Sequence, residues 1–450
     1  MTAPETRTGS GGTGQDAVAP RSGRTTRPGR TTPPGRAPAA GVRLGIILLV
    51  AALNLRMAVA AISPVLDTIQ HDLGLSSAAG LLDTVPIFCF GLFALLTPRL
   101  IARFGMEWLL VIVMVVITAG IALRLLPPVA ALFAGTAVAG AGIAVGNVLL
   151  PGLIKQDFAA KAGLMTGLYS VTLFVGPALA AGLTVPIMHA ADISWRPAIA
   201  VWGGVAVLAA LLLSPHAAAR SRARRIAHGP APDLIREGTG PAPAGATPAG
   251  SAPAGSIWRD SLAWMVAGFM GLQSLGYYSG VAWIPTLLQS HGMDAGQAGW
   301  MLSYSSFPGL VAALVTPLLI RGRARVAALL VVIATVCCGA GVAGLAFAPL
   351  AFTYGWMTIL GLGQGMCISL ALGFIVARAP DVHHTARLST MAQSSGYMVA
   401  SAGPFVVGGL HGLTGEWRVP MLSLLVVLVP LLGCGLGASR DRHVLAPKSR

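Results

Sequence analysis

The chain has 450 residues, of which 55% are hydrophobic and only 10% are charged, and its mean hydropathy is +0.75. Soluble domains carry about 25% charged residues, so this composition excludes a soluble protein and indicates one that crosses the lipid bilayer many times. The formal net charge of +15 by itself suggests a nucleic-acid partner. The distribution of the charges, described below, argues against that partner and instead orients the chain in a membrane.

The chain begins with residues 1–43, which are rich in Gly, Pro, Thr and Arg and predict a disordered cytosolic tail. Beyond it, apolar runs of about 20 residues, the length that crosses a bilayer, recur up to residue 438. These runs predict twelve transmembrane helices, at roughly 44–66, 79–98, 107–126, 129–153, 163–187, 196–214, 261–289, 298–320, 326–346, 351–377, 387–411 and 418–438.

The helices fall into two sets of six, in an N-terminal half at 44–214 and a C-terminal half at 261–438. One constant shift aligns Leu53 with Leu272 and Thr97 with Thr316, so the halves are interpreted as a parallel repeat. The arginine-rich and low-complexity stretch 215–260 predicts a flexible cytosolic linker, and residues 439–450 predict a short cytosolic tail. The predicted fold is therefore an all-α membrane protein with two pseudo-symmetric six-helix halves.

All but four of the 30 Lys and Arg residues lie in the tails, in the linker or in loops on the side of the membrane that the N-terminus occupies. The exceptions are Arg56, Arg124, Arg196 and Arg418. Positive residues concentrate on the cytosolic side of membrane proteins, so we expect a cell-membrane protein with both termini in the cytoplasm. We also expect it to function as a monomer.

Arg56 lies near the middle of the first predicted helix, in LGIILLVAALNLRMAVAAISPVL. An arginine at the bilayer centre costs roughly 2.5–3.5 kcal/mol and rarely faces lipid. We therefore expect Arg56 to face a polar interior and to hold an anionic substrate, with pairing to a carboxylate as the structural alternative. Asp83 is the only acid well inside a predicted helix and the only candidate for coupling. The depth of Asp83 in its helix predicts that it lies in the outer vestibule and is not part of an obligatory proton relay.

Two further polar residues share the first predicted helix with Arg56. Asn54 lies about 200° around the helix from Arg56, so it either reaches the cavity or hydrogen-bonds a neighbouring helix, and both alternatives stay open. Ser63 follows Arg56 by seven residues and shares its face on a continuous helix.

Neutral polar residues recur in the predicted interior of both halves. In 261–289, Gln273 and Tyr277 share a helix face, and in 387–411 Gln393 and Tyr397 repeat that spacing. Such side chains orient a small polar ligand, or alternatively form interhelical hydrogen bonds worth about 0.6 kcal/mol per pair. Two weaker candidates, next to small-residue packing faces, are Asn147 and Gln364. The sequence shows no nucleophile with a base, no phosphate-binding loop and no metal-ligand spacing, so neither an enzyme nor a cofactor is expected.

Several strings, among them LNLRMAVAAISPVL, GAGIAVGNVLLPGLIKQDF, GLMTGLY, FMGLQSLGYYSGVAWIPTLLQ, GLGQG and MAQSSGYMVASAGP, occur together. With them the chain resembles the cyanate-permease and 2-nitroimidazole-transporter family of the major facilitator superfamily, from about residue 44 to 438. The resemblance implies twelve helices, no cofactor, and small anionic or weakly polar substrates.

The resemblance also implies residues for gating. Arg103 and Gly105 match the superfamily signature between the second and third helices, although Ala102 replaces its usual acid. Gly176–Pro177 partly matches the antiporter signature of the fifth helix, and Gly403–Pro404 is its counterpart in the second half. Both pairs are predicted kink sites.

These features predict a secondary active or facilitative transporter that moves a cyanate-like or nitroimidazole-like solute by alternating access. The alternative on the same fold is a multidrug exporter, but exporters of cationic drugs tend to have a buried acid and here the mid-depth charge is positive. A membrane sensor without flux is the third hypothesis, and it is disfavoured because no folded extramembrane domain is predicted.

Overall fold

The computed structural model describes residues 38–74, 81–227, 256–347, 350 and 352–445, and every regular element in these ranges is a helix. The predicted tail up to residue 37 and most of the predicted linker lie outside the described residues. Residues 1–42 and 43–450 form two separate units. The packing described below is that of residues 43–450.

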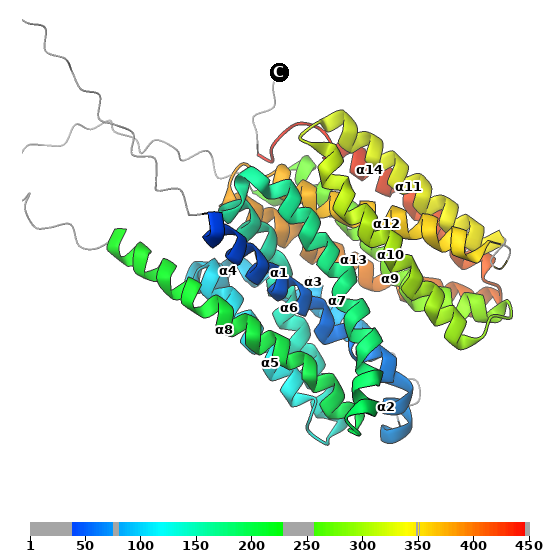
Figure 1. The fold of residues 1–450 in the computed structure, drawn as a ribbon. Coiled ribbons are helices and arrows are strands. Elements are labelled where there is room, and N and C mark those ends of the chain that lie inside the picture. The colour runs from blue at the N-terminus through cyan, green and yellow to red at the C-terminus, as the bar shows by residue number, and fades with distance from the viewer. Residues whose placement is uncertain (1–37, 75–80, 228–255, 348–349, 351, 446–450) are drawn as a thin grey trace, which may run out of the picture. The chain divides into compact units, whose positions relative to one another are not determined.

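The first set of helices precedes the linker, and its members lie as follows: α1 Pro38–Ala60, η1 Ser63–Val65, α2 Leu66–Leu73, α3 Leu81–Ala94, α4 Thr97–Phe104, α5 Met106–Leu123, α6 Val129–Asp157, η3 Ala159–Lys161, α7 Ala162–Ala190 and α8 Trp195–Ala227. Within this set α5 packs between α6 and α8, and α3 packs on α6 (Figure 1).

The second set follows the linker: η4 Ile257–Arg259, α9 Ser261–Ser290, α10 Ala295–Ile320, α11 Ala324–Phe347, α12 Thr353–Ala377, α13 Val382–Thr414 and α14 Arg418–Ala438. Here α9 packs on α13 and α14, and α12 packs on α10 and α11 (Figure 1). Aspartates fix three starts, because the side chains of Asp260, Asp294 and Asp381 accept hydrogen bonds from backbone N–H groups in the first turns of α9, α10 and α13.

Several helix bounds differ from the predicted ones. The first helix begins at Pro38, so residues 38–43 of the predicted disordered tail are helical. The first helix ends at Ala60 and not at residue 66, because a residue that precedes a proline is disfavoured in helical conformation and Pro64 follows shortly. The predicted helix 79–98 is instead the pair α3 and α4, bent by 59° where Pro98 opens α4. Helix α8 continues through Pro215 to Ala227, so the first part of the predicted linker is helical.

Nine of the described helices are long and apolar enough to cross a membrane, or ten if the bent pair α3 and α4 is one span. Helices α9 and α13 do not pass this test, although they contain 30 and 33 residues. They are also the helices that carry the predicted glutamine and tyrosine residues. By length and composition, the described helices thus support nine or ten of the twelve predicted spans, and α9 and α13 occupy the places of the two others.

The two sets meet mainly through α7 with α10 and α12, and through α13 with α3 and α6. Glycines allow close approach at these contacts: a Cβ atom on Gly167 would lie 2.7 Å from Pro317, and one on Gly91 would lie 2.8 Å from Met398. One cluster of buried apolar side chains runs through both sets. The contacts therefore join the two sets through an apolar interior.

Candidate functional site

Arg56 of α1 reaches across to both polar helices of the second set. Its Nη1 donates a hydrogen bond of 2.8 Å to the Tyr278 hydroxyl on α9, and its Nη2 donates one of 3.1 Å to the Tyr397 hydroxyl on α13. Its Nε atom is buried and has no hydrogen-bond partner. The guanidinium thus joins three helices, and its Nε–H donor is unused.

No ion pair among the described side chains involves Arg56. Aromatic rings lie around its guanidinium: the Phe90 ring centroid is 5.7 Å from the guanidinium carbon. The rings of Phe90 and Tyr397 meet edge to face at 5.3 Å, and those of Tyr278 and Tyr397 lie 6.4 Å apart. Within the described residues, the positive charge is held by phenol hydroxyls and ring faces and not by a carboxylate.

Gly176 explains how α1 and α7 come together beside Arg56. A Cβ atom at this position would lie 2.8 Å from the carbonyl oxygen of Leu53 and 3.3 Å from the Cβ of Arg56. Gly403 has the same function in the second set, where a Cβ atom would lie 2.4 Å from Ser279 of α9. Both helices run on without interruption through the following prolines, Pro177 and Pro404.

A second polar layer links α6, α7 and α13. The Nε2 of Gln393 donates a 2.6 Å hydrogen bond to the backbone oxygen of Asn147 and another to the Ser389 hydroxyl. The Tyr169 hydroxyl donates to the Asn147 side-chain oxygen at 3.5 Å, and the Nδ2 of Asn147 is buried without a partner. Two of the predicted residues, Asn147 and Gln393, are therefore brought together across the two sets.

Asn54 lies on the other side of α1, fully buried, and donates a 3.3 Å hydrogen bond to the backbone oxygen of Trp202 on α8. Of the two open alternatives, this geometry is that of a bond to a neighbouring helix. Ser63 lies in η1, beyond the end of α1, and is exposed. Because α1 ends at Ala60, the expectation that Ser63 shares a helical face with Arg56 is wrong.

Gln273, Tyr277 and Gln364 line a different space, a cavity of about 40 Å³ enclosed by α9, α11, α12 and α14. The space is large enough for water, and its other walls are mostly apolar. Arg56 does not line it. The α9 face that carries Gln273 and Tyr277 thus points toward the other helices of its own set, whereas Tyr278, the next residue in the chain, points to Arg56.

The two signature residues, Arg103 in the last turn of α4 and Gly105 between α4 and α5, lie at the end of the bundle that is predicted to be cytosolic. Gly105 has a φ of 75°, a conformation that favours glycine, and it ends α4 and begins α5. Arg103 is exposed, with its guanidinium 5.4 Å from the Phe104 ring centroid. Asp83 lies in α3, but its side chain is outside the described part of the structure.

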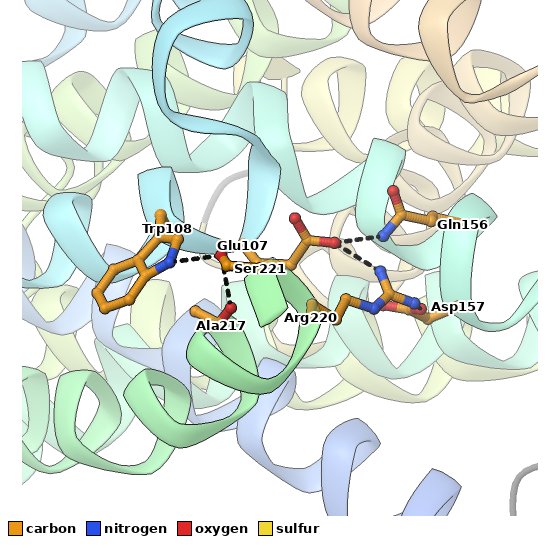
Figure 2. A network of polar contacts seen from close by, with 7 residues as sticks. All are labelled: Glu107, Trp108, Gln156, Asp157, Ala217, Arg220 and Ser221. Atoms are coloured by element: carbon orange, nitrogen blue, oxygen red, sulfur yellow. Dashed lines mark hydrogen bonds and ion pairs between the residues drawn. The ribbon is translucent and has the colours of Figure 1, made fainter. Parts of the chain in front are cut away.

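A polar network at the same end joins α5, α6 and α8 (Figure 2). Arg220 of α8 pairs with Glu107 at 2.6 Å and also with Asp157, and Gln156 donates to Glu107 at 2.9 Å. The side chains of both acids are at most 7% exposed. The network fixes the end of α6 to its own set of helices.

Lys155, next to this network, crosses to the second set. Its ammonium group donates to the backbone oxygens of Val376, at 2.8 Å, and of Ala379. These carbonyls lie at the C-terminus of α12, where the helix dipole favours a positive charge. Arg378 fixes that helix end in turn, since it donates to the backbone oxygens of Ala438 and Ser439.

Tyr278, Phe90 and Lys155 were not among the residues that the sequence predicted for the site. The spacing that groups Gln273 with Tyr277 excludes Tyr278, although the Ser274–Tyr278 spacing of four residues marks a second polar stripe. Nothing in the sequence distinguishes Phe90 from other apolar residues of its helix, or Lys155 from other basic residues near helix ends. Within the described residues, no group of three or more His, Cys, Asp or Glu side chains is placed to hold a metal ion.

Comparisons with known proteins agree with this architecture. The family described as Major Facilitator Superfamily matches residues 48–404. The chain is 38% identical to the uncharacterized transporter YycB of Bacillus subtilis (strain 168), over 87% of this chain and 92% of that protein. It is 35% identical to the 2-nitroimidazole transporter of Escherichia coli (strain K12), over 88% and 95%. With the cyanate transport protein CynX of the same organism the identity is 26%, over 83% and 91%.

The fold is also that of solved transporters. The proton:xylose symporter XylE, bound to 6-bromo-6-deoxy-D-glucose, superimposes with a TM-score of 0.67 at 13% identity, over 88% of this chain and 95% of that one. At this identity the likeness concerns the fold alone. The predicted resemblance and fold class are confirmed, and the chain belongs to the Major Facilitator Superfamily, as a multi-pass membrane transporter and not an enzyme.

Proposed function

We propose that the chain is a secondary active or facilitative transporter that moves a small anionic or weakly polar solute across the cell membrane by alternating access. The observation that carries this proposal is Arg56, a cation within a membrane-spanning helix whose described partners are neutral and whose Nε is unused. An arginine at this depth is costly unless it has a function or a partner. Cyanate and 2-nitroimidazole, the compounds in the names of two relatives, are the solutes to test first.

In this proposal Arg56 anchors the solute and Tyr397 lies beside it, while Asn147 and Gln393 hold the neighbouring layer. A cationic-drug exporter is the second candidate, but the positive charge of Arg56 disfavours its substrates. The protein acts as a monomer, with both termini in the cytoplasm.

The test is a binding titration on the purified full-length protein and its Arg56→Ala and Arg56→Lys variants, with cyanate and 2-nitroimidazole as ligands. A hydrogen bond to a charged group is worth roughly 1.5–3 kcal/mol, so alanine loses about tenfold or more in affinity. Lysine loses less, because it keeps the charge without the planar fork. Arg418→Ala removes an exposed arginine and is the matched control. Unchanged affinity in well-folded Arg56→Ala overturns the proposal.

Alternating access requires two bodies that move against each other, and we assign these to the first set of helices, through Ala227 of α8, and to the second set up to residue 438, joined by the remainder of the predicted linker. Lys155 is proposed to hold the cytosolic side closed through its hydrogen bonds to Val376 and Ala379, a contact that we call the cytosolic latch. Arg220 and Arg378 support it by fixing the two helix ends that it joins.

Asp83 is proposed to lie in the outer vestibule, outside any obligatory proton relay. Asp83→Asn is expected to keep most transport and its pH dependence, measured as solute flux into proteoliposomes with an imposed pH gradient. Complete loss of proton-coupled flux in a normally folded variant would assign Asp83 to the relay instead.

A further inference from the structure

Arg56 presents two donors to two separate oxygen atoms in this structure. The Tyr278 and Tyr397 hydroxyls each take one terminal nitrogen, at 2.8 and 3.1 Å. An arginine binds a carboxylate in the same way, with two adjacent N–H groups directed to its two oxygens. Each hydroxyl therefore accepts from one of the two terminal nitrogens that a carboxylate would use, and the buried Nε atom is a further donor.

The walls of this site are aromatic. Phe90 presents its ring to the guanidinium at 5.7 Å, and its edge-to-face contact with Tyr397 has a centroid separation of 5.3 Å. Tyr277, which lines the separate cavity, packs edge to face against Tyr278 at 5.2 Å and so supports that ring from behind. Ring faces and edges favour a flat aromatic partner beyond the effect of buried area alone. A saturated ring of equal size and charge receives only the buried-area part.

We propose that Phe90, Tyr278 and Tyr397 determine specificity, and that they select a planar aromatic ring bearing a carboxylate. The carboxylate takes the two terminal nitrogens of Arg56 from the tyrosine hydroxyls, and the ring lies among the aromatic side chains. This rests on the proposed function, in which Arg56 binds the solute. It adds the shape of the solute and the residues that recognise it.

The test compares benzoate with cyclohexanecarboxylate, two carboxylates with rings of equal carbon number, in calorimetric titrations of the full-length protein. Benzoate is expected to bind about fivefold tighter or more, the effect of two aromatic contacts. Phe90→Leu removes one wall and is expected to reduce this ratio. Tyr278→Phe and Tyr397→Phe keep both rings and remove the competing hydroxyls, so the ratio is kept and benzoate binds as tightly as before or tighter.

The outcomes separate the two proposals. Equal affinity of wild type for both acids, with both lost in Arg56→Ala, overturns the aromatic selection and leaves the proposed function intact. Benzoate binding that is unchanged in Arg56→Ala overturns both. Absence of binding of either acid to wild type overturns the aromatic selection alone, since cyanate and 2-nitroimidazole still test the function. A tenfold weakening of benzoate in both Tyr→Phe variants contradicts the displacement of the hydroxyls. The comparison on wild type decides even where a variant fails to fold.

Discussion

Lys155→Met is the most direct perturbation of the proposed cytosolic latch. Methionine keeps much of the side-chain length and apolar volume but removes the ammonium group that donates to Val376 and Ala379. Hydrogen bonds that involve a charged group are worth roughly 1.5–3 kcal/mol. If the latch exists only while the cytosolic side is closed, its loss moves the ratio of closed to open molecules about tenfold or more toward open.

The assay is a distance measurement between spin labels on the two sets of helices. Ala159 and His383 are exposed near the two ends that Lys155 joins, and serve as label sites after the native cysteines are replaced. Lys155→Met is expected to increase the population at long distance, while Lys155→Arg keeps donors and changes it less. Lys161→Met, which removes an exposed lysine nearby, is the control. A distance distribution that is the same in wild type, Lys155→Met and the control would refute the latch.

Three further predictions concern stability, measured by thermal unfolding of purified protein. Gly176→Ala is expected to destabilise the protein by about 1–3 kcal/mol, because its Cβ would lie 2.8 Å from a backbone oxygen of α1. Gly182→Ala on the same helix meets nothing within 4 Å, so this control is expected to be neutral or stabilising. Equal effects of the two variants on stability would contradict the close packing of α7 on α1 at Gly176. Arg220→Ala removes hydrogen-bonded ion pairs to two buried carboxylates and is expected to lower the free energy of unfolding by about 1.5–3 kcal/mol. The control Arg222→Ala removes an exposed arginine and is expected to change it little. A similar decrease in both variants would show that the network adds no stability. Burial raises the pKa of the Asp381 carboxyl, but hydrogen bonds from the first turn of α13 outweigh this effect and lower that pKa below its ordinary value. The contribution of ionised Asp381 to folding stability is therefore present above the ordinary pKa and is lost as the pH falls through the lowered pKa. Asp381→Ala is expected to cost about 0.5–2 kcal/mol at neutral pH, with a smaller difference from wild type in acid; a difference that grows in acid would contradict the assigned sign.

The sequence by itself determined the class of the fold. Twenty-residue apolar runs need the bilayer, and the internal repeat predicts two related sets of helices, because these properties are local or periodic along the chain. The position of Arg56 in an apolar helix was enough to predict that it faces other helices, since exposure to lipid is costly. The close-approach function of glycines such as Gly176 was not predicted, because it depends on the helix that packs opposite.

Only the tertiary structure decided the partners. Tyr278 reaches Arg56, and Gln273 and Tyr277 do not, because the rotation of α9 depends on packing against α13 and α14 and not on its own sequence. Phe90 reaches Arg56 from α3, a different helix. Asn54 and Arg56 are two residues apart on one helix, yet one bonds α8 and the other α9 and α13. Lys155 likewise gains its role only where α6 meets the end of α12, a contact between residues more than 220 positions apart. Periodicity in a sequence says which residues share a helix face, but the neighbouring helices decide what that face meets.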